Sequence, residues 1–161
     1  MSIVVNSTPL ISLSIIGKLD LLQSIFGDVY MPRAVYDEVL VNGIDKIGYS
    51  ELSEITWFQV SDVENVELKR SIMLQLDVGE AEVITVAKDK EISLVCIDEF
   101  AGRQYANLLG LDVVGTLGVL LIAKHQGYIS NIKPLIDKLI ENERYISKGL
   151  YEEVLRKAGE L

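Results

Sequence analysis

The sequence predicts a single α/β domain over residues 1–161, with a mainly parallel central sheet of about five strands flanked by helices. Short apolar runs alternate along the chain with segments of helical spacing, which is the pattern of a parallel sheet with helical crossovers. The runs are continuously apolar, as in strands covered on both faces. A chain of 161 residues can bury one core and needs no second domain.

The spacing of apolar residues predicts where each strand and helix lies. The apolar runs predict strands at residues 3–5, 29–30, 57–60, 94–97 and 113–114. Helical spacing predicts helices at residues 8–16, 18–25, 32–42, 64–74, 78–89, 100–109, 116–126, 131–142 and 148–158. Four glycines fall where these helices should end: Gly17, Gly27, Gly110 and Gly127. Residues 41–55 have the weakest pattern and are expected to form a loop.

Composition narrows the classes of function. The 24 acidic and 15 basic residues give a net charge of −9, which argues against a broad basic surface for nucleic acid and favours a local group of carboxylates that holds cations. No apolar run reaches the roughly 20 residues of a membrane helix. The sequence has no secretory signal, and its one cysteine, Cys96, lies in an apolar run. We therefore expect a cytoplasmic protein with no membrane partner.

Four polar residues are the candidate catalytic and metal-binding set: Asn6, Glu38, Glu80 and Asp98. Each follows a predicted strand or lies in the first turns of the next helix. The carboxyl ends of parallel strands share one edge of a sheet, so these side chains are expected to converge. Three carboxylates and a carboxamide form an oxygen-rich group suited to Mg²⁺ or Mn²⁺.

Each candidate also has an interpretation without a catalytic role. Asp77 and Glu80 have the spacing of a capping box at the start of a helix. Glu38 fits a solvated helix position, and Asp98 could cap the helix that follows it. The sequence leaves these alternatives open.

Other chemistries have little support. The lone His125 has no histidine or cysteine at metal-ligand spacing. The chain has neither a G-x-G-x-x-G nor a Walker pattern, so a nucleotide cofactor is not expected.

Five segments resemble the PIN-domain superfamily and, more narrowly, its uncharacterised VapC-like branch. They cover nearly the whole chain: "VVNSTPLISLSIIGKLDLL", "MPRAVYDEVL", "LDVGEAEVITVA", "LVCIDEFAGRQYANLLGLDVVGTLGVLLIAKHQGYI" and "PLIDKLIENERYISKGLYEEVLRKAGE". The resemblance implies a PIN-like fold. It also implies an endoribonuclease that hydrolyses RNA phosphodiester bonds with Mg²⁺ or Mn²⁺, commonly as the toxin of a toxin–antitoxin pair with a small cognate antitoxin.

Carried onto this sequence, the resemblance gives Asn6, Glu38, Glu80 and Asp98 as the catalytic and metal-binding positions. Asn6 stands where typical PIN nucleases have aspartate. A neutral carbonyl oxygen replaces a charged one there, so we expect metal affinity to fall roughly tenfold to a hundredfold. The alternative is a catalytically weakened PIN-fold module that binds RNA or regulates a partner.

Further candidate contacts are polar residues close to this set in the sequence or on the following helices. The candidates for substrate binding are Ser7, Thr8, Arg103 and Lys124, whose simpler roles are helix capping for the hydroxyls and solubility for the cations. Residues 66–76 and the helix after Pro32 carry more apolar residues than one covered face needs. Because PIN proteins of this kind commonly dimerise, we expect a homodimer.

Overall fold

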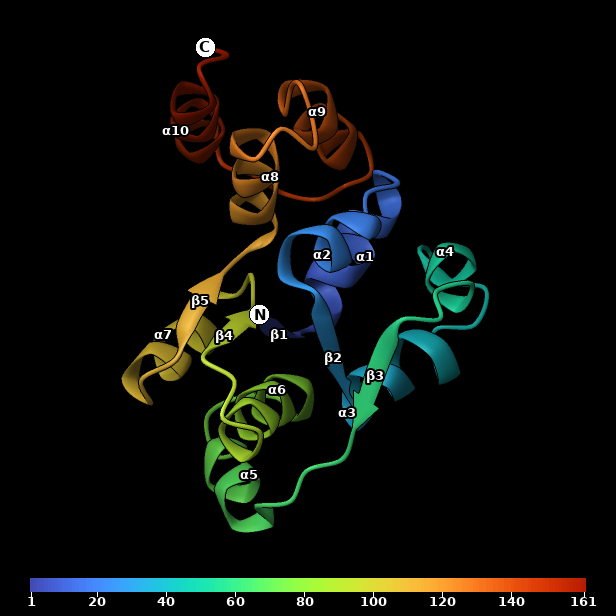
Figure 1. Cartoon of the computed structure of the whole chain (residues 1–161), viewed down its shortest axis with the longest axis vertical. Coiled ribbons are helices and arrows are strands. Elements are labelled where there is room, and N and C mark those ends of the chain that lie inside the picture. The colour runs from blue at the N-terminus through green and yellow to red at the C-terminus, as the bar shows by residue number, and fades with distance from the viewer.

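The computed structural model describes residues 1–161 and contains one five-stranded, all-parallel sheet in the order β3-β2-β1-β4-β5 (Figure 1). All five predicted strands are confirmed, with ends shifted by no more than two residues: β1 (Ser2–Val5), β2 (Asp28–Pro32), β3 (Phe58–Ser61), β4 (Leu94–Cys96) and β5 (Asp112–Val114). The buried apolar residues of the strands and helices form one continuous core. The predicted α/β class is therefore correct.

The helices also follow the predicted pattern. They are α1 (Ser7–Ile15), α2 (Asp20–Phe26), α3 (Arg33–Tyr36) continued by the π-helix η1 (Asp37–Val41), α4 (Tyr49–Ser53), α5 (Val66–Ile72), α6 (Val78–Asp89), α7 (Phe100–Leu108), α8 (Thr116–His125), α9 (Lys133–Glu141) and α10 (Lys148–Ala158). Only α4 was expected to be loop. No single helix is long and apolar enough to cross a membrane, although α1 and α2, bent by 116°, pass that test together as core helices can.

The helices form two groups around the sheet. Helix α6 packs against β1, β2 and β4, and α5 packs on α6. Helix α8 packs against α1, α2 and α10. Figure 1 shows α5 and α6 below the strands and α8, α9 and α10 above them. The side chains of the central strand β1 are mostly buried because both of its faces are covered, whereas the edge strands β3 and β5 are largely half-buried or exposed.

The order of the strands places a switch point at β1. From β1 the chain moves to β2 and β3 on one side, and then returns to β4 and β5 on the other. Open α/β sheets bind ligands at the carboxyl end of such a switch point. Here the backbone N–H of Asn6 donates to the Cys96 carbonyl at 3.0 Å, so the residues that follow β1 and β4 lie side by side.

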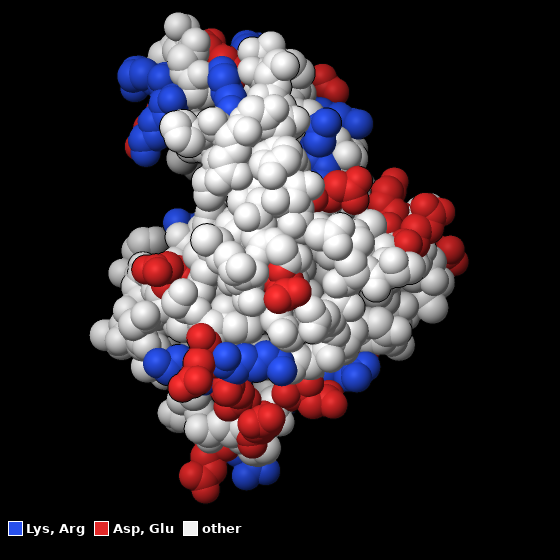
Figure 2. Space-filling view, in the orientation of Figure 1, with Lys and Arg blue, Asp and Glu red and all other residues white.

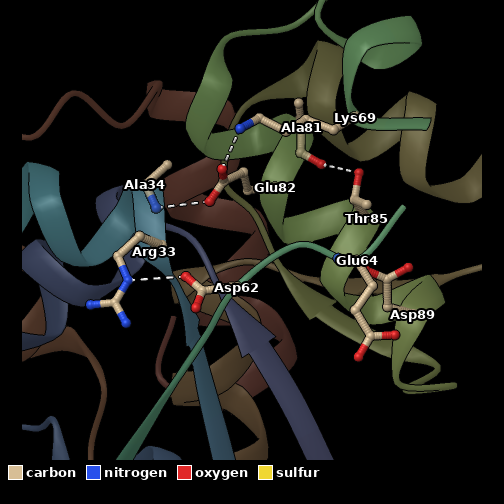
Figure 3. A network of polar contacts seen from close by, with 9 residues as sticks. All are labelled: Arg33, Ala34, Asp62, Glu64, Lys69, Ala81, Glu82, Thr85 and Asp89. Atoms are coloured by element: carbon tan, nitrogen blue, oxygen red, sulfur yellow. Dashed lines mark hydrogen bonds and ion pairs between the residues drawn. The ribbon is translucent and has the colours of Figure 1, made fainter. Parts of the chain in front are cut away.

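A buried carboxylate holds α3 against α6. Glu82, on α6 and only 6% exposed, accepts hydrogen bonds from the Ala34 backbone N–H at 2.8 Å and from the Lys69 ammonium at 2.6 Å (Figure 3). On the exposed side of α3, Arg33 pairs with Asp62, which follows β3, at 3.1 Å (Figure 3). Because α3 continues into η1, these contacts fix the segment that carries Glu38.

We expect Glu82→Ala to lower the free energy of unfolding by about 1 to 3 kcal/mol, because the Ala34 N–H and the Lys69 ammonium lose their acceptor. Asp62→Ala, which breaks an exposed pair on the same helix, is the matched control and should cost less than about 1 kcal/mol. Urea unfolding of both variants measures the difference. Equal midpoints for the two variants would contradict a structural role for Glu82.

Candidate metal centre

Three carboxylates meet at the carboxyl edge of the sheet. Oxygen atoms of Asp77, Glu80 and Glu99 all lie within 4.8 Å of one another. Asp77 is the N-cap of α6, Glu80 lies in the first turn of that helix, and Glu99 is the N-cap of α7. We call these three residues the acid cluster.

The sequence positions Glu80 through the start of α6. Asp77 Oδ1 accepts a hydrogen bond from the Glu80 backbone N–H at 2.8 Å, which confirms the interpretation of Asp77 as a helix cap. The Glu80 side chain lies against α7, with Oε2 beside Gly102. One short motif therefore both starts the helix and brings two carboxylates together.

Glu80 is the most unusual member of the acid cluster. Its side chain is 4% exposed, its Oε2 atom is buried without a hydrogen-bond partner, and it forms no ion pair with Lys or Arg. Burial, followed by the charges of Asp77 and Glu99, raises the pKa of Glu80 from 4.5 to about 7. A buried acceptor of this kind is costly to leave unmatched, and a cation would satisfy it.

The neighbouring acids share this electrostatic environment. Burial raises the pKa of Glu99 above its ordinary value, and the charges of Asp77, Asp98 and Glu38 add to the shift. Glu38 and Asp98 therefore lie within electrostatic reach of the acid cluster. The site concentrates negative charge with no cation paired to it.

Two glycines make room for the side chains. A Cβ added to Gly102 would collide with Glu80 Oε2 and would approach Ile97 Cγ2 to 3.0 Å. A Cβ added to Gly79 would lie 3.4 Å from Asn6 Oδ1 and 3.6 Å from Asp77 Oδ1. The Asn6 carbonyl oxygen thus faces the start of α6, beside the acid cluster.

We expect Gly102→Ala to displace the Glu80 carboxylate and to weaken divalent-metal binding at least tenfold. The overpacked side chain should also cost about 1 to 3 kcal/mol of stability. Calorimetric titration with Mn²⁺ and urea unfolding measure the two effects. Gly149→Ala is the matched control, since a Cβ there meets nothing within 4 Å; a metal affinity for Gly102→Ala equal to that of this control would contradict the placement of Glu80.

The structure places the four candidate catalytic residues at the same edge but not in one ligand set. Asn6 is 4% exposed and lies beside Gly79 at the start of α6. Glu38 is exposed on η1, and its carboxylate is not among the converging oxygens. Both oxygens of Asp98 accept from Thr116, from its N–H at 2.7 Å and its hydroxyl at 2.6 Å. Asp98 therefore caps α8 rather than α7.

Three of the four candidate substrate contacts lie at this edge of the sheet, and one does not. Ser7 is buried and Thr8 is half-buried at the start of α1. Arg103 Nη1 donates to the Ile97 carbonyl at 3.0 Å, near Asp98. The structure does not bring Lys124 to this edge. It lies near the end of α8, where its ammonium donates to the Ala158 carbonyl and pairs with Glu160 at 2.9 Å, so these contacts hold it to the C-terminal residues instead.

Two members of the acid cluster were not among the candidate site residues. Asp77 was interpreted only as a cap, although a cap uses one oxygen and leaves the other free. Glu99 directly follows Asp98, and the sequence does not indicate which of two adjacent acids turns toward the site. The sequence feature that could indicate Asp77 and Glu99 is the pairing of two acids within the short segments "LDVGE" and "IDEF".

The donor set fits a hard divalent cation. Every atom that converges on the site is a carboxylate or carboxamide oxygen, which is the ligand type of Mg²⁺ and Mn²⁺. Glu80 contributes an oxygen to this group, and its Oε2 has no hydrogen-bond partner elsewhere in the fold. Asp77, Glu80, Glu99 and Asn6 are thus the residues that could hold such an ion.

Comparison with known proteins agrees with this arrangement. A family model described as a PIN domain matches residues 2–160. PIN domains are generally nucleases that use divalent metal ions, which is the chemistry that the acid cluster can support. Comparisons with curated proteins and with solved structures give no significant match. Because the family model covers nearly the whole chain, the protein belongs to the PIN-domain family.

Proposed function

We propose that the protein is a metal-dependent endoribonuclease of the VapC-like branch, which hydrolyses RNA phosphodiester bonds at the acid cluster. The observation that carries the proposal is Glu80 Oε2, a buried carboxylate oxygen without a partner inside a group of three acids. A fold that served only stability would gain little from such an atom. Membership of the PIN family supports the same chemistry.

Asp77, Glu80 and Glu99, with the Asn6 carbonyl, would hold Mg²⁺ or Mn²⁺. The ion, when bound, stabilises the charge that develops on a phosphate and lowers the pKa of the attacking water. The chain's own residues do the rest. Asp77 fixes the first turn of α6, Gly102 lets Glu80 lie against α7, and the surrounding apolar core excludes water from the buried carboxylate.

Glu38 and Asp98 have supporting roles in this proposal. Glu38 is close enough to influence the pKa of Glu99, and its exposed carboxylate can accept a proton from substrate or water at the edge of the site. Asp98 fixes the start of α8 through Thr116. Arg103 lies beside Asp98 and is the proposed phosphate contact, since its guanidinium has donors beyond the one used by Ile97.

The partners belong to the same proposal. We place the protein in the cytoplasm, in agreement with its single buried thiol Cys96, with a small antitoxin as its cognate partner. A homodimer is supported by large apolar side chains that stay exposed at Met73 and Leu74, directly after α5, and at Ile44 and Ile47, between η1 and α4. Light scattering at micromolar concentration tests the dimer, and a species of 17.9 kDa alone would contradict it.

The test of function is cleavage of a mixed RNA pool by purified protein with Mn²⁺, with Mg²⁺ and with chelator. We expect cleavage with either ion and none with chelator. Asp77→Asn and Glu99→Gln should each reduce cleavage strongly, whereas Glu67→Gln, which neutralises an exposed acid on α5, should not. Cleavage that survives chelation would contradict a metal-dependent site.

A catalytically weakened RNA-binding or regulatory module is the second candidate. It is favoured by Asn6, which provides one charge fewer than the aspartate of typical PIN nucleases, and by the pKa of Glu80 near 7, which leaves that acid partly protonated at neutral pH. RNA binding without cleavage in either metal would select this function over the nuclease.

A further inference from the structure

A cavity of about 300 Å³ is lined by Asp98, the residue that precedes Glu99 of the acid cluster. Its walls come from α1, the start of α8, and the loop between α9 and α10. Asp98 and Thr116 line it, so the cavity shares the carboxyl edge of the sheet with the acids. Its volume is at the lower end of the range of about 300 to 1,000 Å³ for ligand pockets. A single nucleotide unit is the scale of ligand that such a space can take.

The lining of the cavity combines apolar walls with polar groups. Leu117, Leu139 and Ile146 supply apolar surface. Thr8 and Ser12 lie four residues apart on α1, which places both hydroxyls on one face of that helix, and both line the cavity. Flat apolar ligands with hydrogen-bonding edges suit a lining of this type, and a nucleobase is such a ligand.

The loop between α9 and α10 brings an aromatic ring and a cation to the mouth of the cavity. Glu143, two residues after the end of α9, adopts φ +63°, and the Arg144 N–H donates to the Leu139 carbonyl at 3.0 Å. This turn places Arg144 and Tyr145 on the cavity, with Tyr145 90% exposed. An exposed tyrosine beside a half-buried arginine can stack on a base and bind a phosphate.

The charge of the molecule favours a polyanion on this side. Residues 124–161 carry seven basic and six acidic side chains, a net charge of +1, whereas residues 1–123 carry eight basic and 18 acidic side chains, a net charge of −10. Figure 2 shows Lys and Arg gathered over α10, whereas Asp and Glu dominate over α4 and around α5. A polyanion such as RNA is therefore repelled least on the side of the C-terminal helices.

We propose that this cavity binds one nucleotide of the RNA substrate next to the scissile phosphate. Its base packs on Tyr145 and the apolar wall, its polar edge meets the hydroxyls of Thr8 and Ser12, and its phosphate lies near Arg144. The inference rests on the proposed ribonuclease function, because it assigns the cavity to the same substrate. It makes the loop between α9 and α10 the part of the chain that selects the base at the cleavage site.

The first test measures binding without cleavage. A short fluorescein-labelled single-stranded RNA of mixed sequence is titrated with protein in chelator and followed by fluorescence anisotropy. We expect Tyr145→Ala to weaken binding about fivefold or more, since base stacking has that size, and Tyr145→Phe to keep most of the affinity. Leu150→Trp, which fills the cavity from α10, should weaken binding as well. Tyr128→Ala, at another exposed tyrosine, is the matched control and should bind like wild type.

The second test reads the bases at the cut sites. With Mn²⁺ present, sequencing of the cleaved ends should show a base preference for wild type and Tyr128→Ala that Tyr145→Ala loses. Cleavage by the wild type with unchanged affinity and unchanged preference in Tyr145→Ala would overturn the inference and leave the nuclease standing. Binding that depends on Tyr145, without cleavage by the wild type in any metal, would instead overturn the proposed function. An absence of RNA binding by the wild type would overturn both.

Discussion

Glu80→Gln is expected to stabilise the metal-free protein while it removes ribonuclease activity. The substitution keeps the shape of the side chain and deletes the charge that burial and two neighbouring acids disfavour. The loss of a metal ligand should reduce cleavage by about a hundredfold or more, since a bound cation stabilises the transition state by several kcal/mol. When substitution of a site residue increases stability, the residue occupies an unfavourable environment that function, and not folding, requires.

The stability effect has a defined dependence on pH. The pKa of Glu80 is about 7 in the folded protein and 4.5 as its reference value, so between these pH values the native state binds more protons than the unfolded state. Stability therefore falls as pH rises through this window, by roughly 3 kcal/mol in total. Glu99, whose pKa is also raised, contributes with the same sign.

Thermal unfolding in chelator measures this effect. At about pH 8 the melting temperature of Glu80→Gln should exceed that of the wild type, and at about pH 4 the two should coincide, because the wild-type acid is then protonated in both states. At about pH 8 and saturating Mn²⁺, the melting temperature of the wild type should exceed that of Glu80→Gln, since only the wild type binds the ion tightly. A Glu80→Gln variant that is less stable than wild type at about pH 8 would show that Glu80 has a structural role.

Asn6→Asp is expected to have the opposite effect on metal binding. The new carboxylate would occupy the position of the Asn6 amide, whose oxygen already faces the start of α6 at Gly79, as Asp77 Oδ1 does. One further charged ligand should tighten Mn²⁺ binding roughly tenfold to a hundredfold and raise ribonuclease activity. The metal-free variant should be less stable than wild type, because a fourth negative charge adds repulsion.

A matched control separates this local effect from net charge. Asn131→Asp adds the same charge at an exposed position before α9 and should leave metal affinity unchanged. Calorimetric titration of the three proteins gives the comparison. Binding by Asn6→Asp that is equal to or weaker than wild type would mean that the asparagine is suited to this site, or that Asn6 does not contact the ion.

The fold could be predicted because its main signals are local. Buried parallel strands are continuously apolar, as in "LVCI", and the glycines with positive φ at 17, 27, 110 and 127 end helices where the pattern indicated. Helix α4 escaped prediction because it has only five residues, begins after Gly48 and carries a weak apolar pattern. Such a short helix is stabilised by tertiary contacts, here including the Ser14 hydroxyl bonds to Gly48 and Glu51.

The sequence predicts the edge of the sheet at which the candidate site lies, but only some of the residues whose side chains converge there. Asn6 directly follows β1, whereas Glu80 lies in the first turn of α6, which follows α5 rather than a strand. Both residues lie at the carboxyl edge because α6 begins there before it leads back to β4. The direction of a side chain after a strand depends on its neighbours. Asp98 turns to Thr116, which leaves the adjacent Glu99 to join the cluster. Thr116 follows Asp98 by 18 residues, so no local pattern could have indicated this contact.

The central claim is that Asp77, Glu80 and Glu99, with Asn6, bind one divalent cation. Calorimetric titration of the full-length protein with Mn²⁺ near neutral pH tests it most directly, with Glu80→Gln and the exposed-acid control Glu67→Gln measured beside the wild type. We predict one bound ion in the wild type and in Glu67→Gln, and affinity at least tenfold weaker in Glu80→Gln. Equal affinity in all three proteins, or an absence of binding by the wild type at millimolar Mn²⁺, would contradict the account.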